Sequence, residues 1–344
     1  MKAARFSRPP GLDVIETPIR ALAADEVMVQ IAACGVCGTD VHIVAGEAHA
    51  RPPVILGHEF AGTIVEIGKA VQGLRVGDAV AVDPNIACGF CYYCRRGQVN
   101  FCENLRALGV DIDGGFAEYC NAPAKQCHLL PADFPLEHGA FAEPLSCCLR
   151  GIERAAILPG QSVAIVGAGT IGLLMLQLAR LSGAGAVHVL DPLESKRAIA
   201  RQLDAETAID PHDSDAVREI AARTHGGCEV VIECVGKPEA AELALALTKR
   251  GSRVVLFGLA ARDAFARLPL QAAFLKELTI LGSILNPFTF HRAVELLTRQ
   301  EIDLAPFALR RIALEQIGEA LDGARQGFGV KALVIPRGAQ DTMR

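Results

Sequence analysis

Residues 162–172 read Ser-Val-Ala-Ile-Val-Gly-Ala-Gly-Thr-Ile-Gly, an apolar run followed by three glycines in the spacing G-x-G-x-x-G. An apolar helical pattern, Ile171–Leu181, follows at once. This order predicts a strand, a tight turn and a helix. The first glycine allows the turn, the second lets a pyrophosphate approach the backbone, and the third lets the helix pack on the strand. The pyrophosphate would lie at the positive end of the helix dipole. We therefore expect a dinucleotide to contact Gly167, Gly169, Thr170, Ile171 and Gly172.

Asp191 ends the next apolar run, 19 residues after Gly172. A carboxylate at this place accepts hydrogen bonds from the adenosine ribose hydroxyls and repels a 2′-phosphate. The sequence therefore favours NAD over NADP. Lys196 and Arg197 follow closely and keep NADP open, because a cation can accept a 2′-phosphate.

Continuous apolar runs alternate with helical patterns after about residue 146, which predicts a doubly wound parallel sheet covered on both faces. The expected strands beyond the first are Val187–Leu190, Val230–Cys234, Arg253–Phe257 and Leu278–Gly282, with helices at Glu194–Leu203 and Glu239–Lys249. Residues at or just beyond the ends of these strands are expected nicotinamide contacts: Gly236, Gly258, Gly282 and Ser283. For Gly236 a plain turn is the alternative.

The segments on either side differ from this pattern. The first 145 residues or so are β-rich, with short runs at Val27–Ala33, Phe60–Gly68 and Asp78–Asp83. After Pro287 come helical runs at Phe290–Arg299 and Leu314–Gln326, and a last strand near Lys331–Ile335.

The composition limits the classes of protein to which this chain can belong. The chain has 344 residues, 51% of them hydrophobic and 21% charged, which suits about two globular domains. A net charge of −5 argues against a nucleic-acid partner. We expect no membrane segment, because glycines break the longest apolar stretch, and no signal peptide, because the N-terminus lacks an apolar run. We therefore expect a cytoplasmic protein, whose 12 cysteines lie in a reducing compartment.

Four cysteines lie within 15 residues, with two, two and seven residues between them: Cys88, Cys91, Cys94 and Cys102. Thiolates at this spacing can complete a tetrahedral zinc shell, and four soft ligands leave no open position. The spacing thus predicts a structural zinc in a polar loop. An iron–sulfur cluster and unligated buried cysteines are the alternatives.

A second set of metal-ligand types comes from two separate segments. Cys37 lies in Cys34-Gly35-Val36-Cys37-Gly38-Thr39-Asp40-Val41-His42, and Gly57-His58-Glu59 follows about twenty residues later. A thiolate, an imidazole and a carboxylate can hold a catalytic zinc and leave its fourth position open. From these residues alone, a structural histidine remains an alternative, as do a Cys34–Cys37 redox pair and simple core cysteines.

Taken together, these motifs resemble the zinc-containing medium-chain dehydrogenase/reductase family of alcohol and polyol dehydrogenases. The segments that carry the resemblance are Gly57–Gly62 with Gly68 and Val71, Cys37–His42, the four-cysteine loop and the glycine-rich turn. The resemblance implies a GroES-like β-rich catalytic domain in two segments, 1–146 and 287–344, with a zinc lobe at about 85–105. A Rossmann domain, 147–286, would be inserted between them.

The same resemblance implies the site. Ala142-Glu143-Pro144-Leu145-Ser146 is similar to sorbitol (polyol) dehydrogenases, with Glu143 where other alcohol dehydrogenases carry a cysteine ligand. Cys37, His58 and Glu59 would bind zinc, and Glu143 would bind the metal or its water. Cys147 or Cys148 could supply a thiolate instead. Thr39 and His42 would relay a proton, although His42 could be purely structural, and Asp40 would anchor the loop.

The implied reaction is the NAD-linked oxidation of a secondary alcohol, above all a polyol, to a ketone by hydride transfer. The alternatives are a threonine 3-dehydrogenase-like activity, a sugar-acid or cyclitol dehydrogenase, and, more distantly, a non-catalytic nucleotide-binding protein. Members of the family are usually oligomeric, so we also expect a homodimer or homotetramer, with Leu278–Leu285 as a candidate edge strand.

Overall fold

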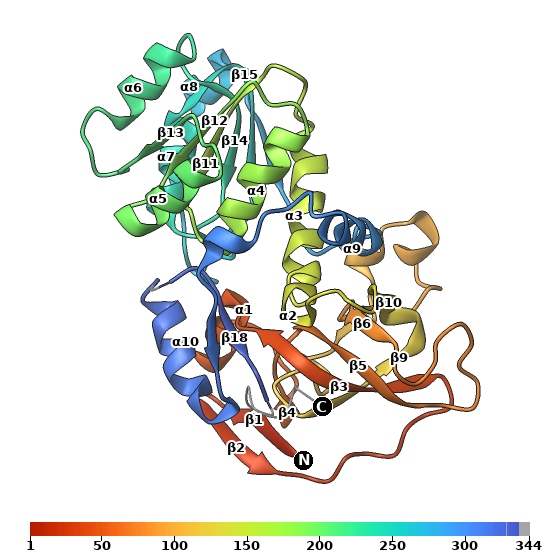
Figure 1. The fold of residues 1–344 in the computed structure, drawn as a ribbon. Helices are drawn as coiled ribbons and strands as arrows, with labels where there is room; N and C mark the ends of the chain where they lie inside the picture. Colours follow the sequence, from red (N-terminus) through yellow and green to blue (C-terminus); the bar gives the residue numbers. More distant parts are fainter. Residues whose placement is uncertain (328, 337–344) are drawn as a thin grey trace. The chain divides into compact units, whose positions relative to one another are not determined.

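The structure, a computed structural model, describes residues 1–327 and 329–336. The chain forms two compact units (Figure 1). Among the described residues, the first unit contains Met1–Ser146, Asn286–Glu301 and the part of 308–336 that the structure describes, and the second contains Cys147–Leu285 with Ile302–Phe307. The last eight residues of the segment expected to return to the catalytic domain lie outside the described part.

The second unit is built on a parallel sheet, as predicted, and the sheet has six strands where five were expected. Its strand order is β13 (Thr207–Ile209), β12 (Ala186–Leu190), β11 (Ser162–Val166), β14 (Cys228–Glu233), β15 (Thr248–Leu256) and β16 (Thr279–Gly282). Helices connect the strands: α4 (Thr170–Leu181), α5 (Glu194–Gln202), α6 (Ala216–Arg223), α7 (Pro238–Ala246) and α8 (Leu270–Leu275). Because the strands are parallel, their carboxyl ends meet at one edge.

The glycine-rich turn has the expected geometry. Gly167 has a φ of +99°, which favours glycine. A Cβ on Gly172 would lie 1.8 Å from the carbonyl oxygen of Gly167, so α4 can approach the turn only with glycine there. A Cβ on Gly169 would meet nothing within 4 Å, which leaves its backbone open to a ligand.

Some predicted boundaries were wrong. The helix expected at Glu239–Lys249 ends at Ala246, and β15 begins at Thr248. The reason is a distant partner, since Thr248 pairs with Cys228 of β14 and so starts the strand early. The run expected at Leu314–Gln326 is divided into a 3-10 turn, η5 (Leu314–Gln316), and α10 (Ile317–Arg325). The short elements β13, α6 and α8 were not predicted.

The first unit is β-rich, as predicted. Its main sheet has the order β10 (Cys127–Leu129), β6 (Ala79–Val82), β5 (Glu59–Ile67), β3 (Glu26–Gly35), β18 (Ala332–Val334) and β17 (Arg310–Ile312), with β9 (Tyr119–Pro123) also paired to β3. A smaller sheet contains β2 (Gly11–Glu16), β1 (Lys2–Arg8) and β4 (Val54–Ile55). The antiparallel pairing of β18 with β3 returns the end of the chain to this unit.

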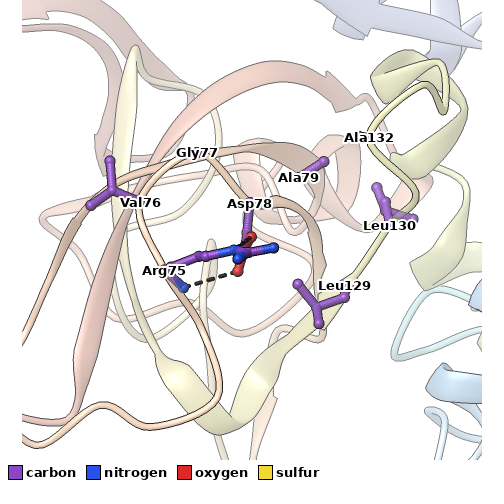
Figure 2. A pocket seen from close by; sticks show the side chains of 8 residues that line it. All are labelled: Arg75, Val76, Gly77, Asp78, Ala79, Leu129, Leu130 and Ala132. Atoms are coloured by element: carbon purple, nitrogen blue, oxygen red, sulfur yellow. Dashed lines mark hydrogen bonds and ion pairs between the residues drawn. The ribbon is translucent and has the colours of Figure 1, made fainter.

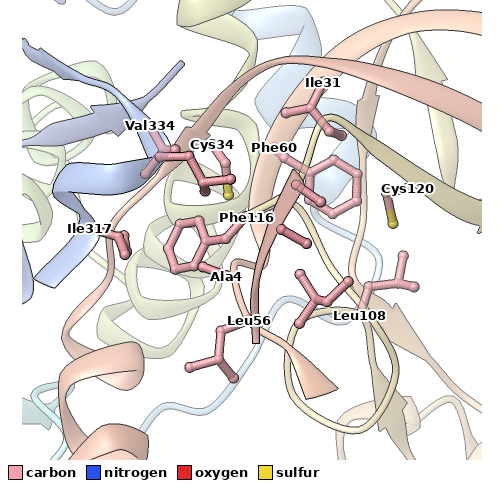
Figure 3. Close-up of a cluster of buried hydrophobic side chains, with 14 of the residues drawn as sticks. Ala4, Ile31, Cys34, Leu56, Phe60, Leu108, Phe116, Cys120, Ile317 and Val334 are labelled. Atoms are coloured by element: carbon pink, nitrogen blue, oxygen red, sulfur yellow. The ribbon is translucent and has the colours of Figure 1, made fainter. Parts of the chain in front are cut away.

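The core of the first unit fixes the strand that leads to the candidate site. Phe60 and Phe116 are fully buried in the same cluster as Leu56 (Figure 3). Val334 of β18 joins this cluster, so the core holds segments from both ends of the chain. Among the described residues, the structure has no helix long and apolar enough to cross a membrane.

Candidate active site

The structure brings Cys37, His58 and Glu59 together. One possible ligand atom from each lies within 4.8 Å of the others. The pairing of β3 with β5 causes this, because Gly35 lies opposite Glu59 in the ladder. Cys37 follows the end of β3 and caps helix α1 (Gly38–Val44), so two adjacent strands deliver all three side chains to one place.

Asp40 organises this cluster. Its Oδ2 accepts from the amide of Cys37 at 3.0 Å, and its Oδ1 lies 3.5 Å from Nδ1 of His58. Burial by itself lowers the pKa of the His58 imidazole, but Asp40 and Cys37 raise it well above its ordinary value. A carboxylate held against one ring nitrogen orients the other toward a metal ion. These contacts suit the role predicted for Asp40, that of anchoring the loop.

The chemistry of the cluster fits a bound zinc ion. Oδ1 of Asp40 and Nδ1 of His58 are buried and face each other, yet neither makes a close hydrogen bond within the described residues. A metal on the other ring nitrogen would make the Nδ1–H group a stronger donor to Asp40. The donor set is one sulfur, one nitrogen and one carboxylate oxygen, which zinc accepts in sites with an open position. The residues present therefore suit zinc.

Cys34 lies outside the cluster although it is only three residues from Cys37. Its side chain is buried, and its thiol faces the carbonyl oxygen of Gly35 at 3.8 Å. Burial, together with the charges of Asp40 and Glu59, raises the pKa of this thiol well above its ordinary value. A thiol that stays protonated is a poor nucleophile, which argues against a Cys34–Cys37 redox pair.

Glu143 is buried in the first turn of α3 (Ala142–Ala155) but is not part of the three-residue cluster. A polar network holds its turn. The Ser146 hydroxyl donates to the carbonyl of Glu143 at 2.6 Å, and Asn286 donates to the Ser146 hydroxyl at 2.9 Å. Asn286 also donates to Asp83 at 3.2 Å, and burial raises the pKa of Asp83 to about 6. Sequence reasoning missed this network, since its members lie far apart in the chain.

Lys331 is the second feature that the sequence did not reveal. This lysine is buried and forms an ion pair with Glu59. A lone lysine at the start of an apolar strand is usually solvated. Only the pairing of β18 with β3 could have indicated that it points inward.

The predicted relay residues both lie on α1. The Thr39 hydroxyl is 3.6 Å from the sulfur of Cys37, and the Thr39 amide donates to the same sulfur at 3.5 Å. His42 lies three residues further along, so both side chains share one helix face. Nδ1 of His42 is 2.7 Å from a carboxylate oxygen of Glu47, a partner that was not predicted.

The four cysteines of the lobe also come together. The sulfurs of Cys88 and Cys94 are 4.0 Å apart, and those of Cys91 and Cys102 are 3.9 Å apart. Tetrahedral zinc with Zn–S bonds of about 2.3 Å requires S···S separations of about 3.8 Å, so the arrangement fits zinc. The backbone amides of Cys88 and Asn104 donate to the sulfur of Cys102, as expected around a thiolate.

The protonation of these thiols indicates the same need for a cation. Hydrogen bonds lower the pKa of Cys88 to about 6, and the bond from the backbone of Phe90 has the largest effect. Burial and the neighbouring cysteines raise the pKa of Cys94 to about 12. Four adjacent thiolates are therefore stable only around a positive ion.

The predicted cofactor contacts gather at the carboxyl edge of the parallel sheet. Asp191 is buried at the end of β12, and its two oxygens accept from the amides of Ala168 (2.8 Å) and Leu193 (2.9 Å). Lys196 lies on α5, and Arg197 is engaged by Glu194 and Asp210. The remaining predicted contacts lie at or just beyond the ends of β14, β15 and β16: Gly236, Gly258, Gly282 and Ser283.

Glu233 is a further residue at this edge that the sequence did not single out. Its carboxylate is buried and accepts from the amides of Val235 (2.6 Å) and Gly236 (2.8 Å). Gly236 and Gly258 interlock beside it, since a Cβ on Gly258 would lie 2.1 Å from the amide nitrogen of Gly236. Burial raises the pKa of Glu233, and the backbone amides that donate hydrogen bonds to its carboxylate oppose this rise.

A separate hollow of about 420 Å³ lies on the first unit between residues 75–79 and 129–132 (Figure 2). Its charged lining residues are Arg75 and Asp78, which form an ion pair at 3.2 Å. The other six lining residues are glycine or aliphatic. With its one carboxylate already engaged, the hollow is poorly suited to acid–base or metal chemistry.

The fold and the two cysteine-containing clusters define a zinc-dependent dehydrogenase with a separate dinucleotide-binding unit. Residues 23–132 match the alcohol dehydrogenase GroES-like domain, and residues 170–299 match the zinc-binding dehydrogenase domain. The chain belongs to the zinc-binding alcohol dehydrogenase family, whose members are oxidoreductases that act on CH–OH donors with NAD(P).

Three similar proteins illustrate the family. An L-threonine 3-dehydrogenase of Pyrococcus furiosus is 40% identical over 72% of this chain and 73% of its own length. A sorbitol dehydrogenase of Bacillus subtilis is 31% identical over 98% of this chain and 97% of its own length. A solved structure from Sinorhizobium meliloti, described as a zinc-binding dehydrogenase bound to NADP, has a TM-score of 0.94 and 40% identity. The match covers 97% of this chain and 99% of that chain.

The assignment of a structural zinc to the four lobe cysteines can be tested by removing one ligand. We expect Cys94→Ser to lower the zinc content by one ion per chain, because a closed thiolate shell tolerates no missing ligand. The melting temperature should fall by at least about 5 °C, since a structural zinc contributes directly to folding. Zinc analysis and calorimetry measure both. Cys127→Ala, at a half-buried cysteine outside the cluster, should keep both ions, and unchanged zinc in Cys94→Ser would contradict the assignment.

Proposed function

We propose that this protein oxidises a secondary alcohol group of a polyol or sugar alcohol to a ketone, with NAD⁺ as hydride acceptor. The observation that carries the proposal is the cluster of Cys37, His58 and Glu59, with Asp40 behind His58. A zinc ion held there supplies Lewis acidity, which lowers the pKa of a bound hydroxyl group. The four lobe cysteines hold a second, structural zinc.

Residues of the chain itself have the other roles in the reaction. Asp40 orients His58, and Glu143 adds a carboxylate that binds the metal or its water. Thr39 and His42 carry the hydroxyl proton away, because their shared helix face leads from the sulfur of Cys37 toward a partly exposed position. The glycine-rich turn binds the dinucleotide at the edge of the parallel sheet.

The charge of the site supports an uncharged substrate. Asp40, Glu59 and Glu143 are buried carboxylic residues of the same unit. Lys331 is a buried cation of that unit, and Glu59 already engages it. A polyol hydroxyl enters this field without repulsion, whereas a substrate carboxylate would need a cation of its own.

L-Threonine is the second candidate substrate. The relative at 40% identity from Pyrococcus furiosus is an L-threonine 3-dehydrogenase, and the reacting group of threonine is also a secondary alcohol. The ammonium group of threonine would find negative charge in this site, while its carboxylate would have to lie away from Glu59 and Glu143.

NAD is the proposed cofactor in preference to NADP. Asp191 lies beside the glycine-rich turn, where its charge repels a 2′-phosphate. Arg197 is not available to bind a 2′-phosphate beside Asp191, because its guanidinium group donates to Asp210 and to the carbonyls of Asp191 and Pro192.

A homodimer formed along β16 is the proposed assembly. β16 is the last strand in the order of its sheet, and Ile280 on it is exposed. Nearby in the chain, Phe274 is 79% exposed and Leu275 63% exposed. Edge strands with apolar surroundings are sites of pairing, and two copies of one edge can pair by a two-fold axis.

A substrate panel tests the proposed reaction. Polyols, cyclitols, sugar acids, L-threonine and simple alcohols are each mixed with NAD⁺, and NADH formation is followed with and without a zinc chelator. We expect chelator-sensitive turnover that is fastest with one group of polyols. Turnover of L-threonine alone would replace the polyol by the second candidate.

The variant Cys37→Ser separates chemistry from cofactor binding. We expect kcat/KM to fall at least about a hundred-fold, because a hydroxyl is a poor zinc ligand, while NADH binding stays within about three-fold. Cys34→Ala is the matched control, since this buried cysteine lies outside the cluster. Near-parental turnover in Cys37→Ser would refute the ligand assignment.

The variant Asp191→Asn tests cofactor choice. It keeps an oxygen for the amide of Ala168 but removes the charge. We expect the ratio of kcat/KM for NAD⁺ to that for NADP⁺ to fall at least about ten-fold, since hydrogen bonds to charged groups are worth roughly 1.5–3 kcal/mol. Asp204→Asn, at an exposed carboxylate of the same unit, should leave the ratio unchanged. If Asp191→Asn also leaves this ratio unchanged, Asp191 does not discriminate between the two cofactors at the ribose.

The assembly is tested by light scattering. We expect the parent protein to be at least dimeric and Phe274→Asp to shift it to monomers, because the new charge would be buried in the interface. Leu158→Asp, at another exposed leucine of the second unit, should leave the assembly intact. A monomeric parent, or a variant that stays dimeric, would contradict pairing along β16.

A further inference from the structure

Lys331 is the only lysine or arginine that is buried among the described residues. The backbone places it there. It immediately precedes β18, whose Leu333 pairs with Gly35 of β3, and the carbonyl of Ala332 accepts from the amide of Val36 at 3.0 Å. The pairing of β18 with β3 therefore places the ammonium group of Lys331 beside the turn that carries Cys37.

The contacts of this ammonium group are specific. Nζ of Lys331 donates to Oε2 of Glu59 and, at 3.1 Å, to the carbonyl of Val36. Gly35 makes room for the pair, because a Cβ there would lie 2.1 Å from Oε2 of Glu59 and 2.7 Å from Cε of Lys331. Three segments of the first unit are thus shaped around one lysine–glutamate pair.

The charges around Lys331 explain why it is tolerated in the interior. Glu59 accepts from its Nζ, and Cys37 and Glu143 are further negative groups whose charges act on it. Together with Asp40, a thiolate and two carboxylates would carry four negative charges against the two positive charges of a zinc ion. Lys331 reduces this imbalance, and a buried site nearer to neutrality is far less costly than a strongly charged one.

We propose that Lys331 competes with the metal ion for Glu59 and so keeps this carboxylate a detachable ligand. The proposal rests on the metal site proposed above. A carboxylate that leaves the metal normally loses its counter-charge. Here the ammonium group of Lys331 remains bound to it, so Glu59 can give up a coordination position to a substrate oxygen without becoming an unpaired buried charge. Lys331 is thus a positioning residue that acts through Glu59.

Zinc retention distinguishes this competition from simple structural support. In Lys331→Met the competing charge is gone, so we expect a chelator to extract the ion at Cys37, His58 and Glu59 at least about ten-fold more slowly, with a lower kcat. Lys331→Arg keeps the charge and should remain within about three-fold of the parent. The zinc of the cysteine lobe, in the same molecule, is the internal reference and reports that the protein is folded.

A double-mutant cycle shows whether the effect passes through Glu59. With Glu59→Gln in place, adding Lys331→Met should change zinc extraction by less than about two-fold, because the shared carboxylate is absent. If Lys331→Gln and Lys331→Met both lose zinc faster than the parent, the lysine supports the site and does not compete. Unchanged extraction would also overturn the inference. A parent protein that binds only the lobe zinc would instead overturn the proposed metal site itself.

Discussion

Negative charge held away from water is the constraint on which the first unit depends. Asp40, Glu59 and Glu143 are all buried, and Cys37 adds a potential thiolate. Isolated carboxylates in a protein interior are costly, so each requires a partner. Asp40 has the amide of Cys37 and the ring of His58, while Glu59 has Lys331. The pairing of β3 with β5 and β18 brings Glu59 and its cation, Lys331, to the turn that carries Cys37, while α3 supplies Glu143.

The second unit uses buried carboxylates in a different way. Asp191, at the end of β12, accepts from the amide of Ala168 in the glycine-rich turn, and Glu233, at the end of β14, accepts from the amides of Val235 and Gly236. These bonds hold the turns that follow the strands, including the glycine-rich turn. Since such turns form the edge where a dinucleotide binds in parallel sheets, the same side chains link the stability of the unit to its function.

Short-range patterns made much of the molecule predictable. The G-x-G-x-x-G turn, the parallel sheet around it and the β-rich first unit follow from residue spacing and apolar periodicity, and the structure confirms them. The residue types of Cys37, His58 and Glu59 made them candidate zinc ligands, the family resemblance favoured that interpretation over the alternatives, and the structure brings the three side chains together.

Features that depend on distant partners could not be predicted in the same way. Lys331 and Asn286 each acquire a role from a partner more than a hundred residues away. The helix expected to reach Lys249 ends early for a related reason, since β14 draws Thr248 into the sheet. Local periodicity carries no information about such pairings.

X-ray absorption at the zinc edge tests the central claim most directly, because it counts sulfur ligands without relying on activity. Four sulfurs in the lobe and one at Cys37, shared between two ions, predict an average of about two and a half sulfurs per zinc. The remaining ligands should be nitrogen or oxygen. An average near two sulfurs would leave Cys37 off the metal. An average near three would bring in another cysteine, such as Cys147 or Cys148, and either result would contradict the proposed site.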